Sequence, residues 1–227
     1  MHPEIKMVVF DMAGTTVNED NLVYKTLMNA INAAGFSYNL DQVLAVAAGK
    51  EKKEAIRSVL KTYGGDFDEA VVTDIYGKFI NQLQQAYEVE AILPQPGATD
   101  IFEKLRDRNI VTVLNTGYDR PTAEAILKKL GWVAGKDFDA LITASEVSQN
   151  RPEPDMILLA MKQYEIADGS AVMKVGDSSI DIEEGQNAGC SLSIGITTGA
   201  HTREQLQNAN PNAVIDHLMQ ILEIIPN

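Results

Sequence analysis

The stretch "VVFDMAGTTVNED" (Val8–Asp20) runs from apolar residues into a single aspartate and then into a glycine turn. The apolar segment Met7–Phe10 predicts a buried strand, and Gly14 indicates a turn directly behind Asp11. In open parallel α/β sheets, ligands bind outside the carboxyl ends of the strands, which is where Asp11 would lie. Asp11 is therefore the first candidate functional residue.

Further apolar segments alternate with helical patterns along the rest of the chain. This alternation predicts βαβ units and an α/β fold with a doubly wound, mainly parallel sheet. The predicted strands are Met7–Phe10, Ile110–Leu114, Ala140–Thr143, Ala171–Val175, Leu192–Ile196 and Ala213–Ile215. The predicted helices are Thr99–Arg106, Arg120–Leu130, Asp155–Tyr164, Ile180–Ala188 and Arg203–Asn208.

The alternation stops between Val17 and Leu93, where apolar residues recur only at helical spacing. The first such set is Val23, Leu27, Ala30, Ile31 and Ala34, and the second is Ile75, Phe79 and Leu83. We expect an all-helical insert of roughly 75 residues, which ends at the helix-breaking "LPQPG". The predicted domains are a core of residues 1–17 and 94–227 and a cap of residues 18–93.

Composition limits the partners that this chain can have. Its 227 residues carry a formal net charge of −13, which argues against nucleic acid or an anionic membrane as partner. A small anionic substrate is still possible, because a site can be locally positive within an acidic protein. The single Cys190 excludes an internal disulfide, and the N-terminus lacks an apolar signal segment, so we expect a cytoplasmic protein.

Candidate site residues follow several predicted strands. Thr116 and Gly117 come after one of them, Asp177 comes after another, and Asp181 opens the next helix. Two carboxylates from different strand ends can hold Mg²⁺, and a threonine with turn N–H groups can bind phosphate oxygens. Arg151 could add a positive charge from a fourth loop. Each residue alone has a structural alternative as a cap, a turn or a surface residue.

Four motifs in this order together resemble the haloacid dehalogenase superfamily. They are "DMAGTT", "NTG", the basic residue of "NRPEP", and "GDSSID", and the helical insert resembles the cap of that superfamily. The resemblance implies that Asp11 is a nucleophile that forms an aspartyl-phosphate. It implies Mg²⁺ as cofactor, with Asp11, Ala13 through its carbonyl group, Asp177 and Asp181 at the metal. It also implies that Thr116, Gly117 and Arg151 bind the transferring group.

Ala13 stands two residues after the candidate nucleophile, where phosphatases of this superfamily usually carry an acid that protonates the leaving oxygen. A methyl group cannot supply that proton. "DMAGTT" resembles the phosphonoacetaldehyde hydrolase branch, in which alanine is expected. There the cleaved bond is phosphorus–carbon, and a cap lysine forms a Schiff base with the substrate aldehyde.

Lys52 is the candidate for that lysine. In "AAGKEKKEAIRSVL" it shares one helical stripe with Ala48, Ala55, Ile56, Val59 and Leu60. It also stands three residues after Gly49, a loop glycine expected at the substrate. Ala48 and Ala55 differ from the methionine and histidine of the phosphonatases. Lys52 could instead bind an anion as a point charge, or have only a structural role.

Three functions stay open at this point. The first is a Mg²⁺-dependent hydrolase of phosphonoacetaldehyde or a close phosphonate aldehyde. The second is a phosphomonoester phosphatase for a small anion such as phosphoglycolate, and the third is a non-enzymatic phospho-aspartate switch. A homodimer formed through the cap is possible, Tyr118 is a further candidate for substrate contact, and His2 and His201 are expected at the surface.

Overall fold

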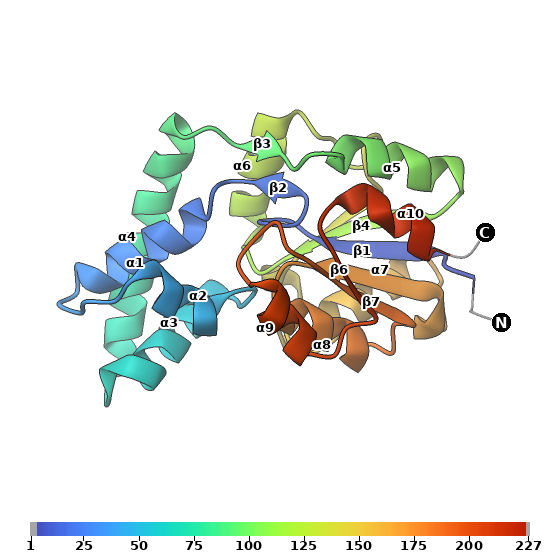
Figure 1. The fold of residues 1–227 in the computed structure, drawn as a ribbon. Helices are drawn as coiled ribbons and strands as arrows, with labels where there is room; N and C mark the ends of the chain where they lie inside the picture. The colour runs from blue at the N-terminus through green and yellow to red at the C-terminus, as the bar shows by residue number, and fades with distance from the viewer. Residues whose placement is uncertain (1–3, 226–227) are drawn as a thin grey trace.

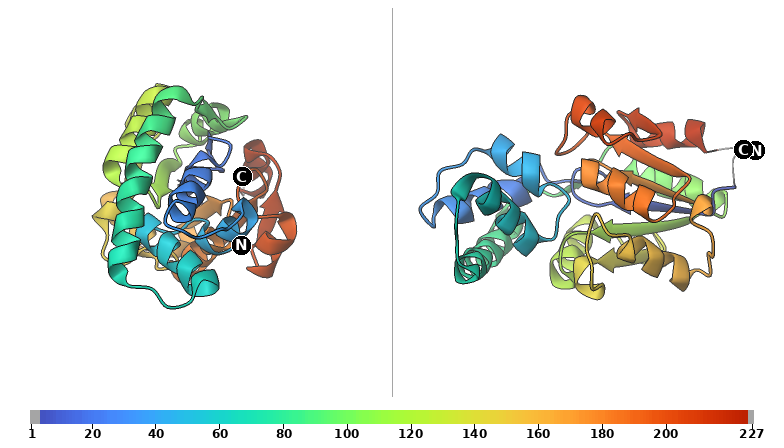
Figure 2. Two further views of the ribbon diagram at one scale, coloured as in Figure 1. Left: turned by 90° about the vertical axis from the view of Figure 1, so that its left-hand side faces the viewer. Right: turned by 90° about the horizontal axis from the view of Figure 1, so that it is seen from below.

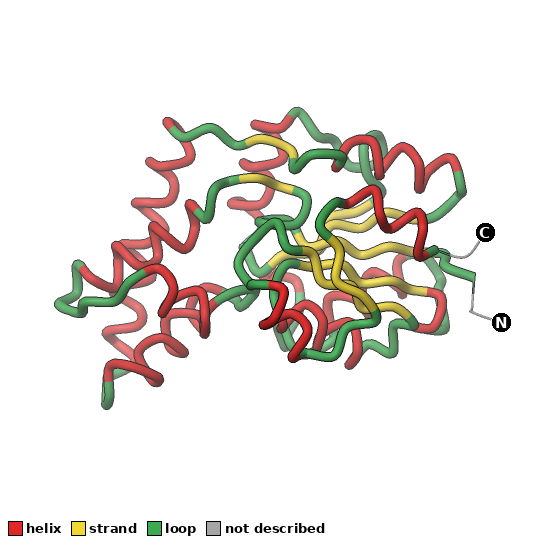
Figure 3. Tube along the Cα trace, in the orientation of Figure 1, coloured by secondary structure: helices red, strands yellow, loops and turns green. Residues whose placement is uncertain are grey.

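A computed structural model describes residues 4–225. Its centre is a six-stranded parallel sheet in the order β5-β4-β1-β6-β7-β8 (Figures 1 and 3). The strands are β1 (Met7–Asp11), β4 (Val111–Thr116), β5 (Ala140–Thr143), β6 (Val172–Gly176), β7 (Leu192–Ile196) and β8 (Ala213–Ile215). The predicted α/β class is confirmed, and β5, β7 and β8 have the predicted bounds.

Helices cover both faces of this sheet, because successive residues of a strand point to opposite sides. Val8 and Phe10 of β1 belong to the same core cluster as Phe102, whereas Met7 and Val9 pack in a second cluster with Met156. The helices of this part are α5 (Ala98–Asp107), α6 (Arg120–Leu130), α7 (Asp155–Gln163), α8 (Ser179–Asn187), α9 (Arg203–Asn208) and α10 (Ile221–Ile224). Figure 2 shows the sheet between these layers.

The segment between β2 (Val17–Asn18) and β3 (Leu93–Pro94) is helical, as predicted. It consists of α1 (Leu22–Asn32), α2 (Leu40–Ala47), α3 (Lys52–Val59), a π-helical turn (Leu60–Gly64) and α4 (Glu69–Val89). We call these elements the helical insert. The side chains of Asn39 and Asp68 accept hydrogen bonds from backbone N–H groups and cap α2 and α4. The exact limits of the two predicted domains stay a prediction.

The connection between sheet and insert consists of two strands. β2 and β3 pair antiparallel, with Val17 opposite Pro94 and Asn18 opposite Leu93. The insert lies beyond the carboxyl ends of the parallel strands (Figure 1). No helix within residues 4–225 combines the length and the apolar character that crossing a bilayer requires.

The topology determines where a site can form. β1 lies at the centre of the sheet, with β4 on one side and β6 on the other. From β1 the chain adds β4 and β5 on one side of the sheet and later β6, β7 and β8 on the other, so the strand order reverses at β1. Open α/β sheets bind ligands at such a position. In the register of β1 and β4, Asp11 lies beside Asn115. The polar residues at the carboxyl ends of these three strands therefore lie close together, on the side of the sheet edge that faces the insert (Figure 1).

Candidate active site

Three aspartates meet at the carboxyl edge of the sheet. Asp11 is the last residue of β1, Asp177 follows β6, and Asp181 lies in the first turn of α8. All three are buried, and each offers a carboxylate oxygen within 4.8 Å of the other two. Asp177 Oδ2 accepts a 2.6 Å hydrogen bond from the N–H group of Ala200. The structure thus places these predicted residues in one cluster.

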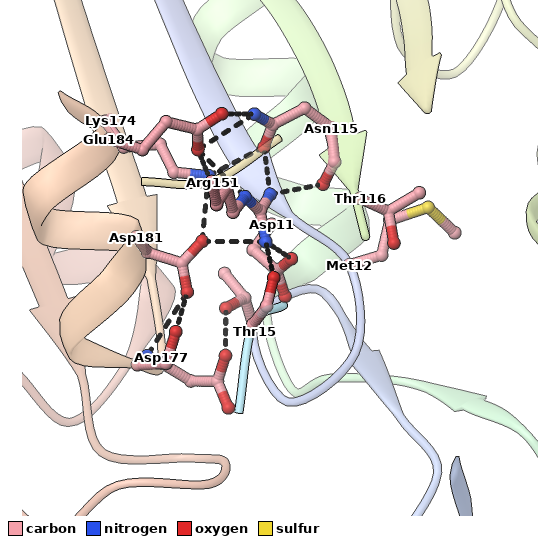
Figure 4. A network of polar contacts seen from close by, with 12 residues as sticks. Asp11, Met12, Thr15, Asn115, Thr116, Arg151, Lys174, Asp177, Asp181 and Glu184 are labelled. Atoms are coloured by element: carbon pink, nitrogen blue, oxygen red, sulfur yellow. Dashed lines mark hydrogen bonds and ion pairs between the residues drawn. The ribbon is translucent and has the colours of Figure 1, made fainter. Parts of the chain in front are cut away.

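Arg151 lies at the centre of a network of buried charges around this cluster (Figure 4). Its Nη1 is 2.7 Å from Asp11 Oδ1 and 3.0 Å from Asp181 Oδ1. Its Nε donates a 2.9 Å hydrogen bond to Glu184 Oε2, and its Nη2 donates a 2.6 Å hydrogen bond to Asn115 Oδ1. Its guanidinium group is thus held on several sides.

Lys174 of β6 is a second buried cation in this network. Its Nζ lies 3.0 Å from Asp181 Oδ1 and 3.1 Å from Glu184 Oε2, and it donates a 2.6 Å hydrogen bond to Asn115 Oδ1. The pKa of Asp181 is low despite its burial, because Arg151 and Lys174 stabilise its charge. These contacts connect β6 and α8 with β4.

The charges of the network suit a divalent cation. The site holds four buried carboxyl groups (Asp11, Asp177, Asp181 and Glu184) and two buried cations, which leaves an excess of two negative charges when all four are ionised. The pKa of Asp177 is well above its usual value, because it is buried and lies near the charges of Asp11 and Asp181. An oxygen-rich site with an excess of negative charge fits Mg²⁺. Ala13, the predicted carbonyl ligand, is half-buried in the turn after β1.

Glycines let the backbone approach this cluster closely. A Cβ atom at Gly199 would lie 2.0 Å from Asp177 Oδ2, and one at Gly14 would lie 2.4 Å from the same atom. Thr116 is buried at the end of β4, and its hydroxyl group accepts a 3.2 Å hydrogen bond from the N–H group of Tyr118. Gly117 follows it, and a Cβ atom there would lie 2.7 Å from the carbonyl oxygen of Lys50.

The insert reaches into the site through the loop before α3. Gly49 has a φ of +74°, and a Cβ atom there would meet Ile180 and Ser178 of the core at 2.2 and 2.5 Å. Its N–H group donates a 2.8 Å hydrogen bond to the hydroxyl group of Tyr24. Because L-amino acids rarely adopt this conformation and no side chain would fit, the position requires glycine.

Lys52 opens α3 and points inward, with only 6% of its surface exposed. Its Nζ donates a 2.8 Å hydrogen bond to the carbonyl oxygen of Lys50 and lies 5.3 and 5.1 Å from the ring centres of Tyr24 and Tyr118. Burial lowers the pKa of Lys52, although the negative charge of Asp11 opposes this effect. The amine is thus buried between the insert and the core.

A cavity of about 260 Å³ adjoins Lys52. Gly117 and Tyr118 form part of its wall on the core side, and Phe79 and Leu83 of α4 form an apolar wall on the insert side. A small substrate in this cavity would touch Lys52 and the loop that follows β4. The contact predicted for Tyr118 is thus geometrically possible.

Several residues of the site escaped sequence reasoning. Lys174 interrupts the apolar segment "AVMKVG", and Glu184 lies one helical turn after Asp181; both signals were available in the sequence. Asn115 lies in the motif "NTG", but nothing in the sequence marked it as a partner of Arg151. The prediction that His201 is a surface residue is wrong: it is 8% exposed, and its Nδ1 accepts a 3.0 Å hydrogen bond from the N–H group of Ser179. His201 belongs to the loop after β7, and this loop packs against the first turn of α8, which removes the imidazole ring from solvent. His2 lies outside the described residues.

The parallel sheet, the helical insert after β1 and the acidic cluster at the strand ends are typical of one class of hydrolases. The chain belongs to the haloacid dehalogenase-like hydrolase family, which it matches over residues 5–189, and it is an enzyme. The resemblance identified in the sequence is thereby confirmed.

Known relatives within this class carry two kinds of names. The chain is 29% identical to a phosphonoacetaldehyde hydrolase of Latilactobacillus sakei over 204 aligned residues. The alignment covers 85% of this chain and 76% of the relative. The chain is 24% identical over 232 residues to a phosphoglycolate phosphatase of Vibrio parahaemolyticus, which covers 98% and 96%. The crystal structure of a phosphonoacetaldehyde hydrolase-like protein from Oleispira antarctica has a TM-score of 0.84 at 24% identity, covering 99% of this chain and 92% of the other; it shares the fold.

Proposed function

We propose that this protein is a Mg²⁺-dependent hydrolase that cleaves the phosphorus–carbon bond of phosphonoacetaldehyde or a closely related phosphonate aldehyde. The observation that carries the proposal is the buried amine of Lys52, which adjoins a cavity at the strand ends and has a lowered pKa. Ala13 supports it, since a carbon leaving group does not need an acid that protonates an oxygen. The phosphonoacetaldehyde hydrolases among the relatives agree with this assignment.

Asp11 is the nucleophile in the phosphoryl half of this reaction. One of its oxygens attacks phosphorus while the phosphorus–carbon bond breaks, and the bonding electrons stay with carbon. Asp11, Asp177, Asp181 and the carbonyl group of Ala13 would hold Mg²⁺, which neutralises charge on the phosphoryl group. Thr116, Gly117 and Arg151 are proposed to bind the phosphoryl oxygens, since such transfer depends mainly on positioning and charge compensation.

Lys52 prepares the carbon leaving group. Its neutral amine adds to the aldehyde, and loss of water gives an iminium ion that accepts the electrons of the breaking bond as an enamine. Burial supports this role, because it disfavours the ammonium form and keeps a larger share of the amine nucleophilic. Gly49 contributes by letting the loop that carries Lys52 approach the core.

A phosphomonoester phosphatase that acts on a small anion such as phosphoglycolate is the second candidate. Ala48 and Ala55 favour it, because the methionine and histidine expected next to a Schiff-base lysine are missing. Lys52 would then bind the carboxylate of the substrate as an ammonium ion. In that case Ala13→Asp should raise the phosphatase rate; an unchanged or lower rate counts against this candidate. The family match supports an enzyme and thus argues against a switch without catalysis.

A release assay with Mg²⁺ distinguishes the two candidates. Phosphonoacetaldehyde and a panel of phosphomonoesters are compared for phosphate release, and borohydride is added to trap an imine on the protein. We expect phosphonoacetaldehyde to be preferred and the trapped adduct to lie on Lys52. Lys52→Arg should abolish both phosphate release from phosphonoacetaldehyde and the trapped adduct. Lys53→Arg, at the neighbouring position, should retain the release and the adduct. Preference for a phosphomonoester without an adduct would favour the second candidate.

A further inference from the structure

A buried carboxyl group lies behind the wall of the cavity. Glu19 belongs to the segment that leads from β2 into the insert, and it is 5% exposed. Its Oε2 accepts hydrogen bonds from the hydroxyl groups of Tyr87 at 2.9 Å and Tyr118 at 3.2 Å. The two hydroxyl oxygens lie 3.1 Å apart. We call Glu19, Tyr87 and Tyr118 the carboxyl–tyrosine cluster.

The members of this cluster come from three separate parts of the chain. Tyr87 lies near the end of α4, Tyr118 follows β4 in the core, and Glu19 lies between β2 and α1. The ring of Tyr118 also faces Lys52 at 5.1 Å and forms part of the cavity wall. Glu19 is thus connected through one hydroxyl group to the wall of the cavity that adjoins Lys52.

Burial raises the pKa of Glu19 to about 7, although the hydrogen bond from Tyr87 opposes the shift. The titratable groups that face Glu19 are Tyr87 of α4, Tyr118 after β4, Lys52 of α3 and Tyr24 of α1. Burial and the charge of Glu19 hold the pKa of Tyr118 well above its usual value, so its hydroxyl group stays protonated. At neutral pH the cluster can therefore both hold a proton and release it.

We propose that Glu19 is a positioning residue for the chemistry of Lys52: through Tyr118, its carboxyl group supplies the proton with which the substrate oxygen leaves as water. This role rests on the proposed Schiff-base function. Glu19 would be a proton source near Lys52, since the methyl groups of Ala13 and Ala55 cannot donate a proton.

Two proton transfers connect Glu19 with the oxygen of the substrate. Lys52 and the aldehyde first give a neutral carbinolamine. Tyr118 then transfers its hydroxyl proton to the carbinolamine oxygen and takes the carboxyl proton of Glu19. The carbon–oxygen bond breaks with its electron pair on oxygen, and the nitrogen lone pair forms the carbon–nitrogen double bond. The products are an iminium ion, water and ionised Glu19. After the phosphorus–carbon bond breaks, a proton from solvent adds to the enamine carbon and gives a second iminium ion. Hydrolysis of this ion yields the free amine of Lys52 and the product aldehyde, and it returns a proton to Glu19.

The test compares Glu19→Gln with the wild-type enzyme in the presence of Mg²⁺. Glutamine keeps an oxygen that accepts hydrogen bonds from the tyrosines, but it does not titrate. With phosphonoacetaldehyde we expect kcat to fall roughly 100-fold, KM to stay within about twofold, and the ionisation near pH 7 to vanish from the kcat profile. Hydrolysis of acetyl phosphate, which needs no imine, should be unchanged. Glu88→Gln, on the exposed side of α4, is the matched control and should retain wild-type rates.

Tyr118→Phe provides a second variant that keeps the carboxyl group in place. It should show a similar loss, and the double variant should lose no more than either single one, because both residues act in one step. An unchanged kcat and pH profile in Glu19→Gln would overturn the role of Glu19 and leave the proposed function standing. An equal loss with acetyl phosphate would also overturn it, as it would indicate a structural role. A wild-type enzyme that forms no adduct on Lys52 would overturn both proposals.

Discussion

Arg151 and Asp11 are 140 positions apart in the chain, yet Nη1 of Arg151 donates a 2.7 Å hydrogen bond to Oδ1 of Asp11. Burial and the charge of Asp181 raise the pKa of Asp11, and the guanidinium group opposes this shift. The cation thus keeps the candidate nucleophile closer to its ionised form. Because the same guanidinium group also binds Glu184 and Asn115, it is held rigidly beside Asp11.

Arg151→Lys is expected to weaken both stability and catalysis. Lysine keeps the positive charge, but it cannot contact Asp11, Glu184 and Asn115 at once as the planar guanidinium group does. Buried partners that lose a hydrogen bond destabilise the protein by about 1–3 kcal/mol. Urea denaturation should show a loss in this range, and kcat should fall by roughly 100-fold or more.

Arg203→Lys is the matched control for this change. Arg203 pairs with Asp216 at 2.7 Å, but both side chains are about half exposed, so the pair contributes less than about 1 kcal/mol. Its stability and kcat should stay close to those of the wild type. If Arg151→Lys were equally harmless, the buried network would not hold the nucleophile as described.

Mg²⁺ should stabilise the protein through the acidic cluster. At a concentration about 100-fold above the dissociation constant, bound metal adds about 2.7 kcal/mol. For a chain of this size this corresponds to a rise in Tm of roughly 5–10 °C. Asp177→Asn should abolish the rise and increase the Tm without metal, because an amide avoids the unfavourable free energy of burying an ionisable carboxyl group beside the charges of Asp11 and Asp181.

Differential scanning fluorimetry with and without Mg²⁺ measures both effects. Asp66→Asn, at an exposed position before α4, should respond to the metal like the wild type. A metal response retained in Asp177→Asn would place the cation elsewhere.

Gly117→Ala should hinder the contact between the insert and the core. The added Cβ atom would lie 2.7 Å from the carbonyl oxygen of Lys50 and 3.0 Å from that of Gly49, and backbone atoms give way only at a cost. We expect kcat/KM to fall at least roughly tenfold while the Mg²⁺-dependent rise in Tm persists. Gly77→Ala, in an exposed and open position of α4, should instead stabilise the protein by about 0.5–1 kcal/mol. Normal turnover in Gly117→Ala would show that catalysis does not need this close approach.

The pH dependence of stability should report the burial of Glu19. Its folded-state pKa of about 7 exceeds the usual 4.5, so the folded protein binds this proton more tightly than the unfolded chain. The stabilisation is complete below about pH 4.5 and is lost as the pH rises to 7, by about 3 kcal/mol for a shift of this size. The difference in unfolding free energy between wild type and Glu19→Gln, measured by urea denaturation from pH 5 to 8, should follow this loss. A difference that does not vary with pH would contradict the raised pKa.

Local sequence patterns were enough to predict the parallel core and the acidic cluster. Strand and helix periodicities are properties of short segments, and β5, β7 and β8 have the predicted bounds. Once the strands are parallel, their carboxyl ends meet at one edge, so Asp11 and Asp177 had to lie near one another. The apolar stripe of α3 likewise predicted which lysine of the insert turns inward.

Other features arise only when distant segments pack together. Lys174 and Glu184 join the network because β6 and α8 face Arg151, and no local period encodes that contact. Glu19, Tyr87 and Tyr118 meet because α4 of the insert lies against the loop that follows β4 in the core. Burial by distant parts of the chain removes water from these groups and thereby shifts their pKa values, so this part of the chemistry depends on the folded contacts and not on the spacing of residues.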